Sequence, residues 1–157
     1  MSDPVVSTGM LIRRPVEEAY QAFVDPEVTR RFWFTHATGP LALGAQVTWT
    51  WAMYGVSTEV EVRAIEPDRR ILIVWDKATE PTEVEWTFEA RGHQTWVTVE
   101  HRGFTGTPGE KAAKAIDSTG GFNLVLAGAK VWLEQGIEPR FVEDHMADHL
   151  VPGWTGR

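Results

Sequence analysis

The segment AQVTWTWAMYGVSTEVEVR, residues 45–63, alternates apolar and polar side chains in two successive runs. A period of two is typical of strands with one buried face, and Trp49 and Trp51 lie on that face in the first run. Three further runs continue the pattern to His101. Turn signals separate the runs, at Tyr54-Gly55, Glu66-Pro67-Asp68, Glu80-Pro81 and Arg91-Gly92-His93. Because short connections join antiparallel neighbours, residues 45–101 predict an antiparallel meander with one apolar face.

Helical spacing precedes this meander. A short strand is expected at 5–13, and Pro15 can open a helix whose apolar stripe runs from Val16 to Val24. Asp25-Pro26 then stops this helix and caps a second short one that reaches about Phe32. Two short helices are therefore expected between the first and second strands.

A second helical pattern follows the meander. Residues 103–118 read as a loop, and an apolar stripe then predicts a helix over 119–135 that covers the sheet. Gly128 inside this helix indicates close approach of another backbone or of a bound molecule. The prediction is an α+β fold in which a curved antiparallel sheet wraps around a long C-terminal helix. One domain is expected over 1–157, with a core at about 4–136 and a helical tail at about 137–157.

The composition excludes several classes of protein. A net charge of −7 has the wrong sign for phosphate-driven nucleic-acid binding. No apolar run approaches membrane-spanning length, so no membrane partner is expected. The absence of cysteine fits a cytoplasmic location. His145 and His149 have metal-like spacing without a third ligand, so neither a metal nor another cofactor is predicted.

Two stretches and one short motif resemble a known superfamily. PVEEAYQAFVDP at 15–26, with Phe32-Trp33-Phe34 after it, resembles the opening helix pair of the SRPBCC (START-like, helix-grip) superfamily. GGFNLVLAGAKVWLEQG at 120–136 is similar to the C-terminal helix of the branch of activator of heat-shock-protein-90 ATPase homologue-like proteins. His101-Arg102-Gly103-Phe104 matches the way that branch leaves its sheet. The resemblance implies a deep apolar cavity between sheet and helix, used by different members for lipids, hormones, polyketides or protein partners, and no shared catalytic set.

The candidate ligand-binding residues converge on this interior. Trp49, Trp51, Trp75 and Trp86 are expected on the concave face with Thr58, and Trp132 on the helix stripe opposite them. These indoles either line a pocket or fill the core. Three further candidates lie at its edges: Trp33 at the entrance, His101 at the end of the last strand and Asn123 near the start of the long helix.

His101 is the single candidate for a catalytic group, because its ordinary pKa suits a general base. The alternative is a structural histidine, since the sequence names no reaction partner for it. Five glutamates, at 59, 61, 83, 85 and 89, alternate away from the tryptophans and are expected on a solvated outer face.

Three functions follow as alternatives. The first is binding of an unidentified hydrophobic small molecule in the cavity. The second is a polyketide cyclase or aromatase-like reaction assisted by His101. The third is a chaperone-regulator-like, stress-related protein-interaction domain. The tail either packs back on the domain or forms a homodimer.

Overall fold

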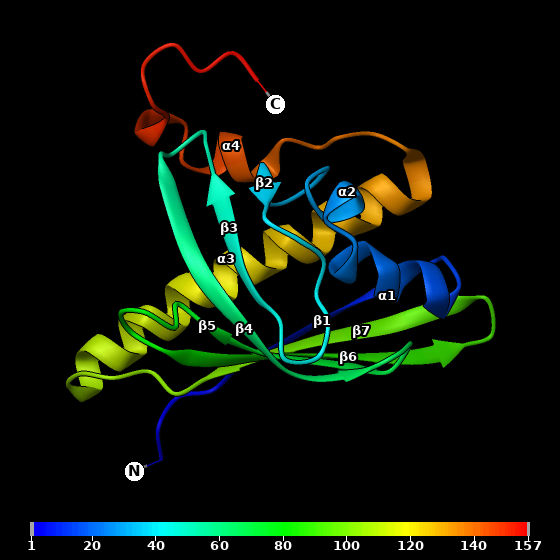
Figure 1. The fold of residues 1–157 in the computed structure, drawn as a ribbon, viewed down its shortest axis with the longest axis horizontal. Helices are drawn as coiled ribbons and strands as arrows, with labels where there is room; N and C mark the ends of the chain where they lie inside the picture. The colour runs from blue at the N-terminus through cyan, green and yellow to red at the C-terminus, as the bar shows by residue number, and fades with distance from the viewer. Residues whose placement is uncertain (1, 157) are drawn as a thin grey trace.

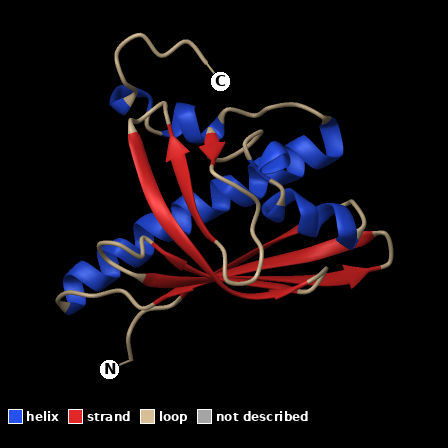
Figure 2. Ribbon diagram, viewed as in Figure 1, coloured by secondary structure: helices blue, strands red, loops and turns tan. Residues whose placement is uncertain are grey.

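The computed structural model describes residues 2–156, and a seven-stranded antiparallel sheet forms its centre (Figure 1). The sheet order is β1-β7-β6-β5-β4-β3-β2. The strands are β1 (Val6–Ile12), β2 (His36–Ala37), β3 (Gln46–Trp51), β4 (Val56–Glu66), β5 (Arg70–Trp75), β6 (Thr82–Arg91) and β7 (Gln94–Arg102). Figure 2 shows the helices gathered on the concave side of the sheet and the opposite face left bare. The predicted α+β architecture is confirmed.

The alternating runs of the sequence form β3 to β7, and the expected residues face inward. In β3 the side chains of Val47, Trp49 and Trp51 are buried while their neighbours are more exposed. In β7, Val97, Val99 and His101 are buried in the same alternating manner. The short strand β2 was not predicted, because two residues are too few to show a period.

Two short helices follow β1 as expected. Helix α1 (Val16–Val24) buries Ala19, Tyr20 and Phe23 against the sheet. Helix α2 (Pro26–Thr29) is capped by Asp25, whose side chain accepts a hydrogen bond from the Glu27 backbone N–H at 3.0 Å. Its last residue is Thr29, so the predicted extension to about Phe32 is wrong.

The long helix α3 (Pro108–Gln135) starts well before the predicted residue 119. Thr107 is its N-cap, and its side chain accepts a hydrogen bond from the Glu110 backbone N–H at 3.2 Å. The Thr107 hydroxyl also donates to the Glu110 carboxylate at 3.1 Å, within the T-x-x-E pattern of a capping box. The predicted loop over 103–118 is therefore wrong beyond Thr107, because this cap fixes the first turn despite two nearby glycines.

Helix α3 covers β1, which is one edge of the sheet. Lys130 Nζ donates to the Leu11 carbonyl at 2.8 Å, and the Arg13 backbone N–H donates to the Glu134 carboxylate at 2.8 Å. These bonds fix the helix across the concave face, so that its other side meets α1 and α4.

At Gly128, the backbone of another segment lies close to helix α3. A Cβ at this position would lie 3.1 Å from Phe32 Cβ and 3.3 Å from the Phe32 carbonyl oxygen. The segment after α2 therefore crosses the helix here, which is the first of the two predicted explanations.

The C-terminal tail packs back on the domain. It contains α4 (Phe141–His145) and a 3-10 turn (Ala147–His149), which replace a single helical segment. The Tyr54 hydroxyl donates to the Val142 carbonyl, and the Val151 backbone N–H donates to the Met53 carbonyl at 2.8 Å. The tail thus lies against the turn between β3 and β4, as Figure 1 shows.

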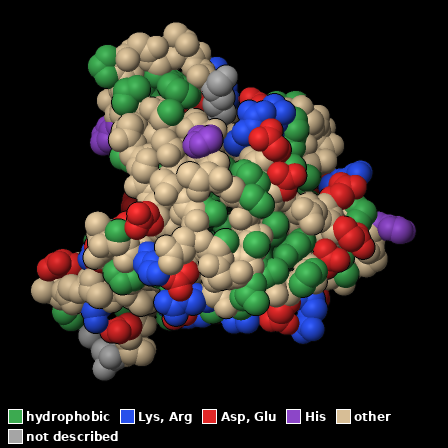
Figure 3. All heavy atoms as spheres, in the orientation of Figure 1, with side chains coloured by type: hydrophobic (Ala, Val, Ile, Leu, Met, Phe, Trp, Pro, Cys, Tyr) green, Lys and Arg blue, Asp and Glu red, His purple; other side chains and the backbone are tan. Residues whose placement is uncertain are grey.

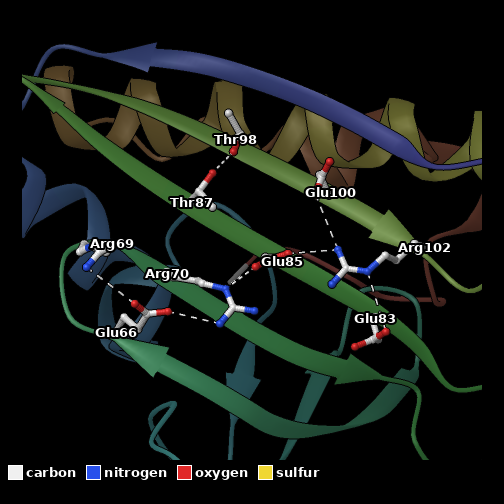
Figure 4. Close-up of polar contacts among 9 residues, drawn as sticks. All are labelled: Glu66, Arg69, Arg70, Glu83, Glu85, Thr87, Thr98, Glu100 and Arg102. Carbon is white, nitrogen blue, oxygen red and sulfur yellow. Dashed lines mark hydrogen bonds and ion pairs between the residues drawn. The ribbon is translucent and has the colours of Figure 1, made fainter.

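The outer face of the sheet carries paired charges. Figure 4 shows Glu85 between Arg70 and Arg102, and its distance from Arg102 Nη1 is 3.1 Å. Burial raises the pKa of Glu85, but hydrogen bonds from Arg70 and Arg102 outweigh burial and leave that pKa below its ordinary value. Glu59 and Glu89 are exposed on the same side. The carboxylates of this face are explained by solvation and ion pairing. Among residues 2–156, no helix combines the length and the apolarity needed to cross a membrane.

Candidate functional site

A cavity of about 440 Å³ lies between the sheet, α3 and α4. Its apolar walls come from the segment after α2, the β3–β4 hairpin, β5, α3 and the α4 region: Trp33, Trp51, Tyr54, Val56, Trp75, Phe122, Leu124, Val125, Val142 and Met146. Its polar and small lining residues are Ser57, Thr58, Asp76, His101, Asp117, Ser118, Gly121 and His145. Figure 3 shows the molecular outline indented between the C-terminal tail and the first half of α3, which flank the cavity. Its volume lies within the range of small-molecule sites.

Contacts between aromatic rings hold the walls in place. The rings of Trp33 and Trp75 stack with centroids 5.6 Å apart and planes inclined by 17°. Trp51 lies 5.7 Å from Trp75, and Phe122 of α3 lies 5.8 Å from Trp33. Each ring is wedged between neighbours, so these walls are preformed.

Five of the predicted site residues meet at this cavity: Trp33, Trp51, Thr58, Trp75 and His101. Two others lie in the core behind it. Trp49 is 2% exposed and stacks on Phe34 at 5.1 Å, and Trp86 is 1% exposed with Phe23 at 5.8 Å. Some of these tryptophans therefore line the cavity, and others fill the core behind it.

Asn123 and Trp132 lie away from the cavity. The Thr8 hydroxyl donates to Asn123 Oδ1, so this side chain faces β1. The Arg31 guanidinium lies 5.1 Å from the Trp132 ring centroid, beside the segment that follows α2. Both predictions assumed a helix that faces the sheet with one stripe, whereas α3 also packs along the edge strand and under the loop after α2.

His101 is buried at the polar end of the cavity, with 7% exposure. Its Nδ1 lies 2.7 Å from the Ser118 hydroxyl oxygen, and its Nε2 lies 2.7 Å from the Thr82 hydroxyl oxygen. A neutral imidazole, with one donor and one acceptor, satisfies both hydroxyls. Burial lowers the pKa of His101 to about 4, so the ring is uncharged at neutral pH.

Several lining residues were missed in the sequence. Asp117, Ser118 and Gly121 belong to the part of α3 that was read as loop or as helix start. The T-x-x-E capping-box pattern from Thr107 to Glu110 is the sequence signal that could have placed Asp117 and Ser118 on a helix. Val142 and Met146 belong to the predicted helical tail, and no sequence signal indicated that they would line the cavity.

Two carboxylates stand at the mouth of the cavity. Asp76 follows Trp75 at the end of β5, and Thr58 Oγ1 donates to Asp76 Oδ1 at 3.4 Å. Asp117, on α3, is exposed and lines the same cavity. Both also line an adjoining hollow of about 210 Å³, in which Lys114 is ion-paired with Glu80.

The described residues near the cavity provide no set of metal ligands. Within residues 2–156 no group of three or more His, Asp or Glu side chains is placed to hold a metal ion. His145 lines the cavity while His149 does not. The site is therefore a tryptophan-walled hollow with hydroxyl, imidazole and carboxylate groups at one end.

Comparisons with known proteins agree with this architecture. No curated protein matches the sequence. Protein SSP2350 from Staphylococcus saprophyticus is 25% identical, with a TM-score of 0.73 over 85% of this chain and 94% of its own. The Aha1 dimer from Colwellia psychrerythraea has a TM-score of 0.71 at 18% identity, covering 85% of this chain and 98% of that chain.

DynU16, a protein of the dynemicin biosynthetic locus, is 22% identical with a TM-score of 0.72. The match covers 87% of this chain and spans about half of DynU16, 49% of its length. The family model for Activator of Hsp90 ATPase homolog 1-like protein matches residues 13–134, from the end of β1 to the end of α3. The chain therefore belongs to the family of Activator of Hsp90 ATPase homolog 1-like proteins.

Proposed function

We propose that this protein binds an apolar small molecule with a flat ring system in the tryptophan-walled cavity. The observation that carries the proposal is a preformed hollow of about 440 Å³ against Trp33, Trp51 and Trp75. Ring faces that border a hollow gain contact area when a flat guest replaces water. The neutral, hydroxyl-bonded His101 adds no charge that would oppose an apolar guest.

Two neighbouring glycines of α3 provide a matched test. A Cβ added at Gly121, which lines the cavity, meets no heavy atom within 4 Å, and the same holds at Gly120, which does not line it. Gly121→Leu therefore adds a side chain at the cavity wall, starting from a Cβ with open space around it, and Gly120→Leu adds the same side chain elsewhere on the helix. Both changes remove a glycine from a helix interior, so neither is expected to unfold the protein.

The probe is 1-pyrenemethanol, whose binding is followed by energy transfer from the tryptophans to pyrene. We expect saturable transfer with the wild type and with Gly120→Leu, and at least about tenfold weaker binding with Gly121→Leu. Thermal unfolding checks that all three proteins are folded. No saturation with the wild type, or equal affinities in the two variants, would refute binding in this cavity.

A second candidate function is an enzyme of the polyketide cyclase or aromatase kind. The contact of 2.7 Å between His101 and Ser118, both lining the cavity, favours it. The low pKa of His101 weakens it, because a general base is most effective with a pKa near the working pH. His101→Ala would abolish loss of water from a linear poly-β-ketone thioester while leaving pyrenemethanol binding intact, as mass spectrometry and energy transfer would show. Turnover that persists in His101→Ala would exclude this role.

Interaction with a protein partner, a homodimer through the tail and a cytoplasmic location stay predictions. The tail residues Val142 and Val151 already contact their own domain through backbone hydrogen bonds, which leaves less of this segment for a second copy. Sedimentation velocity of the full chain and of a chain ending at Gly136 tests the dimer. An unchanged oligomeric state after truncation would rule out the tail as its interface.

A further inference from the structure

The charges at the cavity are all of one sign. Asp76 and Asp117 line its mouth, whereas no lysine or arginine of residues 2–156 is among its lining residues. The other titratable side chains of the lining are Tyr54, His145 of α4 and His101, whose ring is neutral. A guest that enters thus meets carboxylates first.

These carboxylates are available to a guest. Within residues 2–156 neither Asp76 nor Asp117 forms an ion pair, and the one hydrogen bond to them is that from Thr58 to Asp76 at 3.4 Å. The nearest cation of the adjoining hollow is Lys114, which is paired with Glu80 and also donates to the Thr105 carbonyl at 2.8 Å. Within the part of the chain that the structure describes, neither carboxylate at the mouth is therefore held in an ion pair.

The walls favour the same kind of charge. Trp33, Trp51, Tyr54 and Trp75 line the cavity, and aromatic side chains attract an ammonium group that comes over a ring face. Carboxylates beside an apolar cavity also act through a lower dielectric than water, which strengthens attraction to a cation. Aromatic wall and acidic rim thus select one class of guest.

We infer that the ligand of this cavity is an organic cation, with a flat apolar body against the tryptophans and an ammonium-type group between Asp76 and Asp117. This inference rests on the proposed binding function and specifies its ligand class. An anionic guest of the same shape would meet two carboxylates without a compensating cation. A neutral guest would bind through its apolar body alone.

The test compares three probes with one ring system: 1-pyrenemethylammonium, 1-pyrenemethanol and 1-pyrenecarboxylate. We expect the ammonium probe to bind about tenfold more tightly than the alcohol, and the carboxylate probe to bind most weakly. Titrations followed by energy transfer at pH 7.5 give the three dissociation constants. Added sodium chloride should reduce the advantage of the ammonium probe, because salt screens charges at an open mouth.

Two double variants assign the effect to the mouth. Asp76→Asn with Asp117→Asn removes both carboxylates but keeps an oxygen to accept from Thr58, so the ammonium probe should fall to the affinity of the alcohol. Glu17→Gln with Glu89→Gln changes the net charge equally on exposed residues that do not line the cavity, and should preserve the order of the probes.

The outcomes separate the two proposals. If pyrenemethanol binds saturably but the three probes bind alike, or if the Asp76 and Asp117 double variant keeps its preference for the ammonium probe, the inference about charge is wrong while the cavity stays a binding site. If none of the probes saturates, the proposed function itself fails.

Discussion

The two ends of the concave face of the sheet differ in how completely side chains fill them. At the closed end, Tyr20, Phe23 and Phe32 of the α1–α2 region pack on Trp86 and Phe88 of β6, with ring centroids 5.5 to 5.8 Å apart in the pairs Phe23–Phe32, Tyr20–Phe88 and Phe23–Trp86. At the open end, β3 and β5 present Trp51 and Trp75 to the cavity. The strands supply large rings at both ends.

The difference comes from the helices. Those facing the closed end contribute aromatic rings, whereas α3 faces the open end with one ring, Phe122, and with Asp117, Ser118 and Gly121. Ser118 and Gly121 are small and leave space next to the strand tryptophans. The cavity therefore lies where α3 carries these small residues, and the tryptophans form its walls.

Trp86→Ala and Trp75→Ala test this difference most strongly. Trp86 is 1% exposed and packed on all sides, so its truncation should lower the free energy of unfolding by about 3–5 kcal/mol. Trp75 borders a hollow and is only half-buried, so its truncation should cost less, about 1–2 kcal/mol, because its side chain buries less surface than that of Trp86. Urea denaturation followed by circular dichroism measures both.

The control is Trp96→Ala on the outer face, where the Arg91 guanidinium lies 5.4 Å from the ring. It loses an aromatic ring that belongs to neither end of the concave face. Equal costs for Trp86→Ala and Trp75→Ala would contradict the distinction between the closed and open ends.

Most of the closed end could be predicted from the sequence. Alternation places Val47, Trp49 and Trp86 on one face whatever the details of packing, because a slip of one residue would expose them all. The stripe of α1 likewise identified Tyr20 and Phe23. These are local periodicities, which a single sequence reports well.

The open end depends on information that local periodicity does not contain. The rotation of α3 decides that Ser118 and Gly121 face the cavity while Asn123 faces β1. That rotation is set by contacts far along the chain, such as Lys130 with the Leu11 carbonyl. The contact of Tyr54 with the tail is equally nonlocal, so the position of Val142 at the cavity could not be inferred from the sequence.

The pH dependence of stability that comes from His101 distinguishes the buried polar end of the cavity from the solvent-exposed surface. Its folded pKa of about 4 lies below the ordinary value of 6.5, so the unfolded state binds the proton first as pH falls. The stability linked to the neutral ring is complete above pH 6.5 and is lost between pH 6.5 and 4. This loss should amount to about 3 kcal/mol, and His101→Gln should remove it.

Urea midpoints from pH 7 to 4 measure this effect, and the chemical shifts of the His101 ring report its titration directly. The exposed His93 in the β6–β7 turn provides the control, since His93→Gln should leave the pH profile unchanged. A His101 ring that titrates near 6.5 would contradict the burial of this end.

A mutation in the C-terminal tail, at the open end, is expected to have a smaller effect on stability. Glu143 is 1% exposed, and its Oε2 accepts hydrogen bonds from Trp154 Nε1 at 2.9 Å and from Arg140 Nη2 at 3.1 Å. Glu143→Ala should weaken the docking of the tail by about 1–2 kcal/mol, because the buried carboxylate and its hydrogen bonds from Trp154 and Arg140 are lost. Hydrogen exchange should then rise at Val151, whose N–H bonds to Met53, while β6 stays protected.

Asp144→Ala on the same helix is the control, because Asp144 is exposed. If Glu143→Ala leaves exchange at Val151 unchanged, the tail is held by apolar contacts instead of by this carboxylate.

The smallest effect is expected on the outer face of the sheet. Arg70 and Arg102 contact Glu85 but also have Glu66, Glu83 and Glu100 as partners, so Glu85→Gln leaves neither arginine unpaired. The cost should be about 1 kcal/mol or less at neutral pH. Since the folded pKa of Glu85 is lowered, its contribution is present above about pH 4.3 and is lost as pH falls through the folded value.

Urea denaturation of Glu85→Gln and wild type at pH 7 and pH 3 measures this contribution, and the difference between the proteins should shrink at pH 3. The exposed Glu89, paired with Arg91 at 3.0 Å, gives a matched Glu89→Gln control with a still smaller effect. A loss from Glu85→Gln as large as that from Trp86→Ala would mean that the outer ion pairs, and not the packed rings, hold the sheet in its curved form.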